Sequence, residues 1–378
     1  MITPEALKER FIPFRSLKYS TEAFIDYCIP ECQPKFNYAM VGPGVSQNPN
    51  QPVSLREPHG FQIGGVSLPH GKVNPAHMHF TCEVFICTKG TWRIQWGFNP
   101  EVLEATIGEG DIVSVPTWLY RGFTNDGVDD GFLFTVLGGD HTGGILWGPT
   151  TIAAAARNGV YLTDDYRMID TRRGQSLGPN DRLLQAMSNE EIATLRHWSL
   201  EEMSRRIVRF QDLVWSHDGL LDSCLPGCGA QLAPVLGLGV SQDRNTLAPV
   251  SNAHGASVEW LRIPPGGRVS RHQFAEKQVL IAKQGTLNLQ VETNAGPVDY
   301  AIAGGTQGWD TFSLPAQCWR TLSNPGGSDA LALLVSAGDH RKRPQWDPSV
   351  VAAAAAAGYA LDANGHVGAR RFVERAQT

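Results

Sequence analysis

The sequence lacks long apolar runs and any excess of basic side chains. No apolar stretch approaches the ~20 residues that a membrane-spanning helix needs, and the opening residues, MITPEALKERF, do not resemble a secretion signal. The chain has 32 basic and 37 acidic residues and a net charge of −5. This balance argues against the basic surfaces typical of proteins that bind nucleic acid or anionic membranes. We therefore expect a cytoplasmic protein with no nucleic-acid or membrane partner.

Cysteine is scarce, and its number is odd. The seven cysteines are Cys28, Cys32, Cys82, Cys87, Cys224, Cys228 and Cys318. An odd count without a secretion signal favours reduced thiols. Four of them form two CxPxC pairs, but a pair offers only half of the four ligands that structural zinc takes. We expect buried free thiols, with disulfides as the alternative.

Glycine and proline, in contrast, are abundant. The chain has 40 glycines, 24 prolines and a hydrophobic content of 42%, which is typical of a turn-rich β protein with enough apolar residues for two cores. Short segments such as EVFICTKGTWRIQWG and KQVLIAKQGTLNLQVE predict strand–turn–strand units, with turns at Lys89-Gly90 and Gln284-Gly285. The composition and these segments together indicate an all-β fold.

The chain also repeats itself. The segment GPGVSQNPN at 42–50 returns as GLGVSQDRN at 237–245. Further matches keep the same order: His59 with His254, His77 with His272, Arg121 with Arg320, and Trp147 with Trp346. So many matches in one order indicate a tandem duplication of a domain-sized unit. We predict an N-terminal domain over residues 1–166 and a C-terminal domain over residues 209–378.

Between the copies, residues 167–208 form a polar connector. It carries two helix-start signatures, Ser188 with Glu191 and Ser199 with Glu202, so we expect a mostly helical linker. A short helix is predicted after Thr3-Pro4. Each copy also ends in an alanine-rich helix that a glycine terminates, Gly159 in the first copy and Gly358 in the second.

One window carries the strongest functional signal. Residues 71–90 read GKVNPAHMHFTCEVFICTKG and place His77, His79 and Glu83 close together at the end of a predicted strand. The two histidines are two residues apart, so on a strand they project from the same face. Glu83 follows in phase, or on the next strand if the chain turns. Two imidazoles and a carboxylate are a minimal ligand set for a divalent transition metal; the alternative is a polar strand without a metal.

This window resembles the first motif of the cupin family, G(x5)HxH(x3,4)E(x6)G, and fills each fixed position. The second cupin motif, G(x5)PxG(x2)H(x3)N, is matched by Gly110, Pro116 and Asn125, but Trp118 stands in place of its glycine and Arg121 in place of its histidine. The resemblance implies two tandem cupin jelly-roll β-sandwich domains, a bicupin, with short flanking and linker helices. It also implies a metal inside the sandwich.

Arg121 departs from the family's ligand set, since a guanidinium cannot release its proton to bind a cation. Three roles remain open. Arg121 and its counterpart Arg320 could share a structural role, because buried arginines usually form structural pairs. Arg121 could instead hold a substrate oxyanion beside the metal. It could also pair with Glu83 and withdraw that carboxylate from the metal.

The second copy has lost most of the ligand set. His272 remains, but His79 has become Phe274 and Glu83 has become Gln278. One imidazole beside a phenyl ring and an amide is a poor metal site. We therefore predict one divalent transition metal per chain, in the N-terminal copy, with Fe(II) favoured over Mn, Ni or Zn.

Five further residues are candidates for the substrate pocket or its surroundings. Gln62, Gln95 and Tyr120 are candidates for supporting the metal ligands. The aromatic residues Trp92, Trp118 and Tyr120 could line a substrate cavity, although packing in the sandwich core explains them as well.

Three functions are compatible with these residues. The first is an Fe(II) dioxygenase that acts with O₂ on a small phenolic or carbonyl-rich substrate, with Arg121 stabilising negative charge. The second is a metal-dependent isomerase, lyase or decarboxylase of an organic acid. The third is a non-enzymatic bicupin that binds a small molecule. In each case we expect a homo-oligomer, since duplicated sandwiches often associate further.

Overall fold

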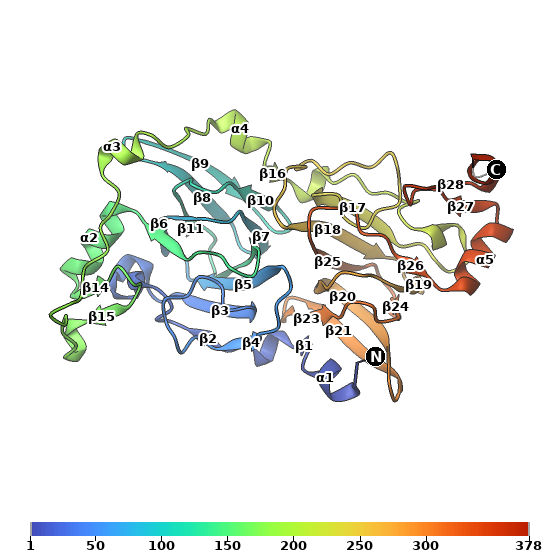
Figure 1. The fold of residues 1–378 in the computed structure, drawn as a ribbon, viewed down its shortest axis with the longest axis horizontal. Helices are drawn as coiled ribbons and strands as arrows, with labels where there is room; N and C mark the ends of the chain where they lie inside the picture. The colour runs from blue at the N-terminus through green and yellow to red at the C-terminus, as the bar shows by residue number, and fades with distance from the viewer. Residues whose placement is uncertain (1, 377–378) are drawn as a thin grey trace. The chain divides into compact units, whose positions relative to one another are not determined.

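The computed structural model describes residues 2–376. Its described part divides into two compact units, one formed by Lys18–Asp212 and the other by residues 2–17 together with residues 213–376. Both units consist mainly of antiparallel strands, with short helices at their margins (Figure 1). The all-β prediction with two tandem jelly-roll domains is confirmed.

Two sheets face each other in the unit of residues 18–212. The larger sheet has the order β16-β10-β7-β12-β5-β3-β2, with β4 beside β3, and the smaller has the order β13-β6-β11-β8-β9. The strands of the larger sheet are β2 (Tyr19–Ser20), β3 (Phe36–Val41), β4 (Val53–Leu55), β5 (Phe61–Leu68), β7 (Glu83–Lys89), β10 (Ile112–Val115), β12 (Gly131–Gly138) and β16 (Ile207–Val208). The smaller sheet consists of β6 (Val73–His79), β8 (Trp92–Phe98), β9 (Glu101–Ile107), β11 (Arg121–Asn125) and β13 (Ile145–Trp147).

Alternation along the strands builds the core between these sheets. In β8, Trp92, Ile94 and Trp96 are buried, whereas Arg93 and Gln95 are partly exposed. The predicted turn between β7 and β8 is present but joins strands of different sheets. Gly90 permits this corner with a φ of 95°, which L side chains rarely adopt.

The second unit repeats this arrangement with one merged sheet. Its main path is β17-β18-β25-β20-β24-β19-β26. The strands on this path are β17 (Gln231–Leu236), β18 (Ala256–Ile263), β19 (Arg268–Gln273), β20 (Gln278–Thr293), β24 (Arg320–Ser323), β25 (Ala330–Ala337) and β26 (Gln345–Trp346). The remaining strands are β1 (Phe11–Ile12), β21 (Gly296–Gly305), β22 (Gly308–Trp309) and β23 (Thr311–Leu314).

The predicted turn at Gln284-Gly285 is wrong, because β20 runs through it as one strand. A register shift against β25 between Ala282 and Gln284 absorbs an extra residue, and Gly285 has a φ of 73°. A bulge and a glycine bend a strand without ending it. The first part of β20 therefore pairs with β23 and β25, and its last part with β21 and β24.

Each unit includes a short strand from the segment that precedes the other copy in the sequence. Strand β1, upstream of the first copy, pairs with β23 of the second unit, whereas β16, upstream of the second copy, pairs with β10 of the first. Helix α1 (Pro4–Lys8), capped by the Thr3 hydroxyl, confirms the short N-terminal helix.

The connector is less helical than its capping signatures suggest. Both capping boxes form, at α3 (Asn189–Ile192) and α4 (Leu200–Ser204), but each helix spans little more than one turn. The rest of the connector consists of β15 (Met168–Asp170), a 3₁₀ turn, β16 and irregular chain. Strand β15 pairs with β14 (Val160–Leu162). No apolar helical face extends beyond the caps, and helices this short need packing to persist.

Both alanine-rich helices are present, as α2 (Pro149–Arg157) and α5 (Pro348–Ala356). Each ends before the predicted glycine, whose φ is 74° at Gly159 and 89° at Gly358. The chain then ends with β27 (Tyr359–Leu361), β28 (Val367–Ala369) and α6 (Arg370–Val373). Among residues 2–376, no helix is long and apolar enough to cross a bilayer.

Candidate metal centre

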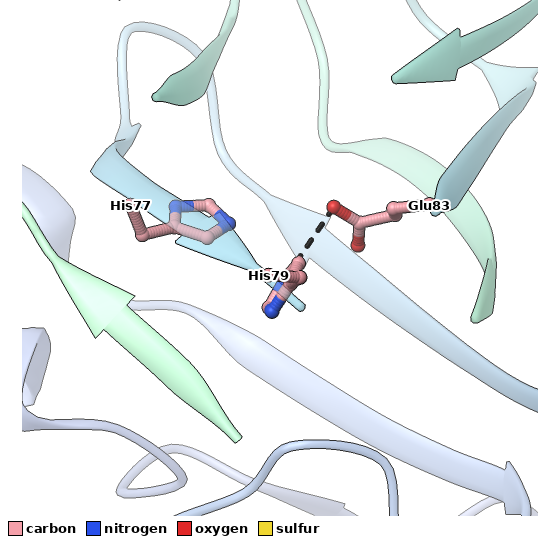
Figure 2. A group of neighbouring side chains, drawn as sticks. All are labelled: His77, His79 and Glu83. Carbon is pink, nitrogen blue, oxygen red and sulfur yellow. Dashed lines mark ion pairs between the residues drawn. The ribbon is translucent and has the colours of Figure 1, made fainter. Parts of the chain in front are cut away.

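Two neighbouring strands bring the three predicted ligands together. His77 and His79 lie at the end of β6, and after the turn at residues 80–82 Glu83 is the first residue of β7. Strand β6 lies in the smaller sheet and β7 in the larger one, so the turn between them carries the carboxylate across the sandwich toward the imidazoles (Figure 2).

The geometry suits a single cation. One potential ligand atom from each residue lies within 4.8 Å of the others. The Nε2 atom of His79 is 3.5 Å from Oε2 of Glu83, the contact drawn in Figure 2. The exposed fraction is 2% for each histidine and 5% for Glu83. Buried ionisable groups this close are costly unless they are paired or hold a metal.

Hydrogen bonds fix the orientation of both imidazoles. Nδ1 of His77 is 2.8 Å from the carbonyl of Pro75, and Nδ1 of His79 is 3.2 Å from the carbonyl of Gly144. A carbonyl can only accept, so each Nδ1 carries the proton and each Nε2 keeps a free lone pair. A backbone carbonyl bonded to the second ring nitrogen is a frequent feature of metal-binding histidines.

The ionisation states also fit a metal. Burial, with a further contribution from the Arg121 charge, holds the pKa of both histidines well below the usual value, so both imidazoles are neutral. Burial raises the pKa of Glu83, and Arg121 opposes that rise. A cation requires neutral imidazole and ionised carboxylate. The donor set therefore fits a divalent transition metal.

Arg121 contacts the carboxylate. Its Nε and Nη2 atoms each lie 3.2 Å from Oε2 of Glu83, and Nη1 donates to the carbonyl of Leu119 at 3.1 Å. The guanidinium is 1% exposed, and Arg121 is not among the residues that line the cavity beside the triad. The structure thus contains the Arg121–Glu83 pair named in the third of these roles, but this pair engages one carboxylate oxygen and leaves the other for a cation.

A buried ionic network that sequence reasoning missed lies behind His77. The ammonium group of Lys35 contacts Asp26 and donates to Oδ1 of Asn74 at 2.6 Å. All three residues are at least nine-tenths buried, and Nδ2 of Asn74 lies 3.3 Å from Nδ1 of His77. The network therefore packs an anchored amide against a ligand ring.

A comparison of matching positions in the two copies could have indicated this network. Asp26 has a counterpart in Asp222, which is also buried. The other two residues of the network have apolar counterparts. Lys35 corresponds to Ala230, since each directly precedes a matching strand pair, Phe36–Ser67 and Gln231–Arg262. Asn74 corresponds to Val269, since Asn74 pairs with Phe123 and Val269 with Leu322. Only the copy with the triad keeps the lysine and the amide.

Replacing Asn74 with valine, the residue of the other copy, should weaken metal binding about tenfold, in line with the loss of other outer-shell partners. The change removes the Lys35 acceptor and the support beside the His77 ring. Competition with a chromogenic chelator measures the affinity. The matched control is Asn324→Val, which changes another buried amide, in the other unit, and should leave the affinity unchanged. Equal affinities for Asn74→Val and the wild type would contradict the supporting role.

The triad borders a cavity of about 90 Å³ inside the first sandwich. Its walls come from both sheets and are mostly apolar, with Phe24, Val66, Phe123, Leu137 and Trp147 among them. Polar groups converge from a few positions: Asn37, Gln51, Gln62, Asn74 and Thr135. A wider surface groove, of about 1200 Å³, shares Gly44, Val45 and Ser46 with this cavity and lies in the same unit, so residues 44–46 lie between the cavity and the groove.

Of the five predicted pocket residues, the structure brings only Gln62 to this cavity. Its amide accepts from the Gly44 nitrogen at 2.6 Å and donates to the Asp140 carbonyl at 2.9 Å, which ties down the loop at the entrance. The other four lie elsewhere. Trp92 is in the core, Tyr120 packs against Phe98, Gln95 contacts Glu104 beside another groove, and Trp118 is 48% exposed.

Trp118 shows how the second motif is built without its glycine. It has a φ of 56°, and its counterpart Gln317 has a φ of 54°, so both copies keep the left-handed turn that glycine would adopt without strain. The backbone nitrogen of Trp118 donates to the His79 carbonyl, and that of Gln317 donates to the Phe274 carbonyl. The strained turn thus holds the end of the strand that carries the ligands.

The corresponding place in the second unit holds no such cluster. His272, Phe274 and Gln278 are buried there, and among residues 2–376 only the triad of the first unit gathers three potential metal ligands. All seven cysteines are free thiols, as expected, and five of them are buried, whereas Cys82 and Cys224 are only partly buried.

The sequence matches no family model and no curated protein. Solved structures, in contrast, match over most of the chain. Oxalate decarboxylase from Lactobacillus farciminis, in a formate complex, is similar with a TM-score of 0.53 and 12% identity, covering 90% of this chain and 89% of that one. Vicilin from tomato, Solanum lycopersicum, is similar with a TM-score of 0.52 and 9% identity, covering 89% and 87%. Identities this low establish a shared fold and nothing about activity.

Proposed function

Because the chain has the fold of a bicupin and gathers two imidazoles and a carboxylate in one cupin domain, we propose that it is a metal-dependent enzyme for a small organic anion. The converging ligand set of His77, His79 and Glu83 carries this proposal. These residues would hold one divalent cation. Such a cation supplies Lewis acidity and, when it is iron, redox chemistry.

The charges around the triad favour an anionic substrate. Glu83 and Arg121 balance each other, as do Asp26 and Lys35. A divalent cation would therefore add two positive charges that no described side chain nearby offsets. Burial magnifies this imbalance, and a carboxylate or phenolate that enters the cavity relieves it.

The lining of the cavity favours reaction with O₂ over proton-transfer chemistry. Apart from the triad, Tyr38 is the only ionisable side chain among the described residues that line the cavity, and burial raises its pKa. A lyase or isomerase needs a group that exchanges protons near neutral pH. Two histidines and one carboxylate, with no fourth protein ligand, are in turn the ligand set of non-haem Fe(II) oxygenases. We therefore favour an Fe(II) dioxygenase.

The chain's own residues perform two tasks in this reaction. Apolar walls from both sheets exclude water from the reacting groups. Amides at Asn37, Gln51 and Asn74 offer hydrogen bonds that can orient the polar atoms of a small substrate.

A second candidate is an O₂-independent decarboxylase of an organic acid. Tyr38 favours it, since a phenol that stays protonated at neutral pH can donate a proton to a carbanion. The similarity in fold to oxalate decarboxylase is compatible with either chemistry.

Protein loaded anaerobically with Fe(II) should consume O₂ in step with the loss of one member of a panel of small carboxylates and phenolates. Oxygen uptake and CO₂ release are measured in parallel, with His79→Ala as the inactive control and Tyr38→Phe as the discriminating variant. Tyr38→Phe should retain most of the oxygenase activity, whereas a decarboxylase that uses this phenol would lose about 10²–10⁴-fold.

Release of CO₂ without O₂, abolished in Tyr38→Phe, would replace the oxygenase with the decarboxylase. Binding of the same anions by metal-free protein, with no turnover after metal loading, would overturn the enzymatic proposal altogether.

A further inference from the structure

One position inside the sandwich differs between the two units. Gly64 of β5 and Glu259 of β18 each lie five residues after one of the matching histidines, His59 and His254, and they occupy corresponding places in their sheets. The side chain of Glu259 is fully buried, with an exposed fraction of 0%. The second unit thus fills with a side chain a place that the first unit gives to glycine.

A side chain at Gly64 would point toward the cavity beside the triad. Gly64 lines this cavity, and a Cβ atom added to it would lie 2.9 Å from Oγ1 of Thr135, another lining residue, and 3.1 Å from the carbonyl of Tyr38. The backbone does not require glycine here, because Gly64 lies within a strand and has no positive φ. A glycine inside a strand weakens the strand and often marks the close approach of a ligand or another chain segment.

In the second unit, Glu259 closes the corresponding space. Its Oε1 accepts a hydrogen bond from the backbone nitrogen of Val240 at 2.8 Å, and its Oε2 lies so close to Gly239 that a Cβ atom there would be 2.7 Å away. These two residues correspond to Gly44 and Val45, which lie between the first cavity and the groove. The cavity that remains in the second unit measures about 30 Å³, against about 90 Å³ in the first.

The charge that accompanies Glu259 is missing from the first unit as well. Burial raises the pKa of Glu259 to about 7, and the charge of Lys342, which is 1% exposed, opposes that rise. Lys342 stands four residues before Trp346. The first unit has Gly143 four residues before the matching Trp147, and no lysine or arginine is among the described residues that line its cavity. A carboxylate at this end of the first cavity would be buried without compensation, which is costly, so this end suits an uncharged group.

We propose that Gly64 determines which substrates the first cupin domain accepts: the anionic end of the substrate binds the cation, and its uncharged remainder lies against Gly64, where the second unit has the side chain of Glu259. This inference rests on the proposed function and narrows the substrate to a small monoanion with an uncharged tail. A side chain at position 64 would shorten the space for that tail. Its nearest neighbours, Thr135 and Tyr38, are not metal ligands, so the metal centre should stay intact.

Xenon tests this position without any metal. Crystals of the metal-free full chain under xenon pressure should show a xenon atom against Gly64, since this gas occupies apolar cavities. Gly64→Val should lose the xenon peak, and Gly64→Ala takes its place if the larger side chain prevents folding. The reciprocal double variant Glu259→Gly, Lys342→Gly copies the first unit and should gain a xenon site in the second. Absence of xenon at Gly64 in the wild type, or an equal peak in the wild type and the Gly64 variants, would overturn the inference.

Protein loaded with Co(II) tests the selectivity in solution. Binding of a carboxylate to the metal changes the visible absorption of Co(II), so titrations with acetate, butyrate and succinate give three dissociation constants. Two more buried CH₂ groups should make butyrate bind the wild type about tenfold more tightly than acetate. Succinate has the length of butyrate but a charge at both ends, so it should bind more weakly than butyrate. Gly64→Val should lose the preference for butyrate and keep the affinity for acetate.

The outcomes separate the role of Gly64 from the proposed function. Bound Co(II) that responds to none of the three anions would contradict anion binding at the metal, and the proposed substrate class would fail with it, whatever the xenon peaks show. Normal acetate binding with succinate tighter than butyrate, or with the butyrate preference unchanged in Gly64→Val, would overturn the role of Gly64 and leave the metal-dependent function standing.

Discussion

His77→Ala is expected to abolish stoichiometric metal binding, whereas His272→Ala should leave it unchanged. His77 contributes one of three ligands, and its Nε2 lone pair cannot be replaced by a neighbouring side chain. Loss of an outer-shell partner alone weakens metal sites by about 10–100-fold, so loss of a ligand should exceed about 100-fold. Elemental analysis after anaerobic loading and chelator competition measure the change.

His272→Ala is an unusually close control. His272 is equally buried, occupies the same register position, opposite Arg320 and Trp346, and donates Nδ1–H to a backbone carbonyl as His77 does. Its removal creates a cavity of the same kind without touching the triad. Retention of one metal per chain at unchanged affinity in His77→Ala would refute the metal centre, and loss of metal in both variants would show that unfolding caused it.

The sequence predicted the duplication, the all-β fold and the convergence of His77, His79 and Glu83. These predictions succeed because period-two spacing, glycine corners and motif spacing act over short stretches of chain. The turn between β6 and β7 is short, so it restricts where Glu83 can lie relative to His77 and His79. The loss of ligands in the second copy was equally visible, because Phe274 and Gln278 stand in the same short window.

Other features depend on contacts between distant segments. Lys35 and Asn74 meet across 39 positions, and no local pattern pairs a lysine with an amide. The aromatic residues Trp92 and Tyr120 were ambiguous from the start, since a core and a cavity recruit the same side chains. Trp118 was misleading, because its left-handed backbone is a property of the turn and leaves the ring exposed.

Arg121→Met should destabilise the metal-free protein by about 3–5 kcal/mol, the usual cost of leaving one member of a buried ion pair alone. Glu83 is 5% exposed, and Arg121 is the cationic side chain that contacts its carboxylate. Urea unfolding measures the loss. The double variant Glu83→Gln, Arg121→Met should recover most of it, because the abandoned charge is gone.

The deficit of Arg121→Met should shrink as the pH falls. Burial already raises the pKa of Glu83, and loss of Arg121 raises it further. A carboxyl whose pKa is higher in the folded than in the unfolded state binds protons more readily when folded, so its destabilising effect grows as the pH rises through that window and fades below it. A saturating divalent metal should also reduce the deficit, since the cation takes over as the counter-charge of Glu83.

Arg320→Met is the matched control. Its contact is with the neutral amide of Gln278, so the change removes a buried charge that forms no ion pair and should be neutral or stabilising. Equal, pH-independent losses in Arg121→Met and Arg320→Met would mean that both arginines act by packing alone. In that case Glu83 would not be an ionised carboxylate available to a cation, and the charge argument for an anionic substrate would fail with it.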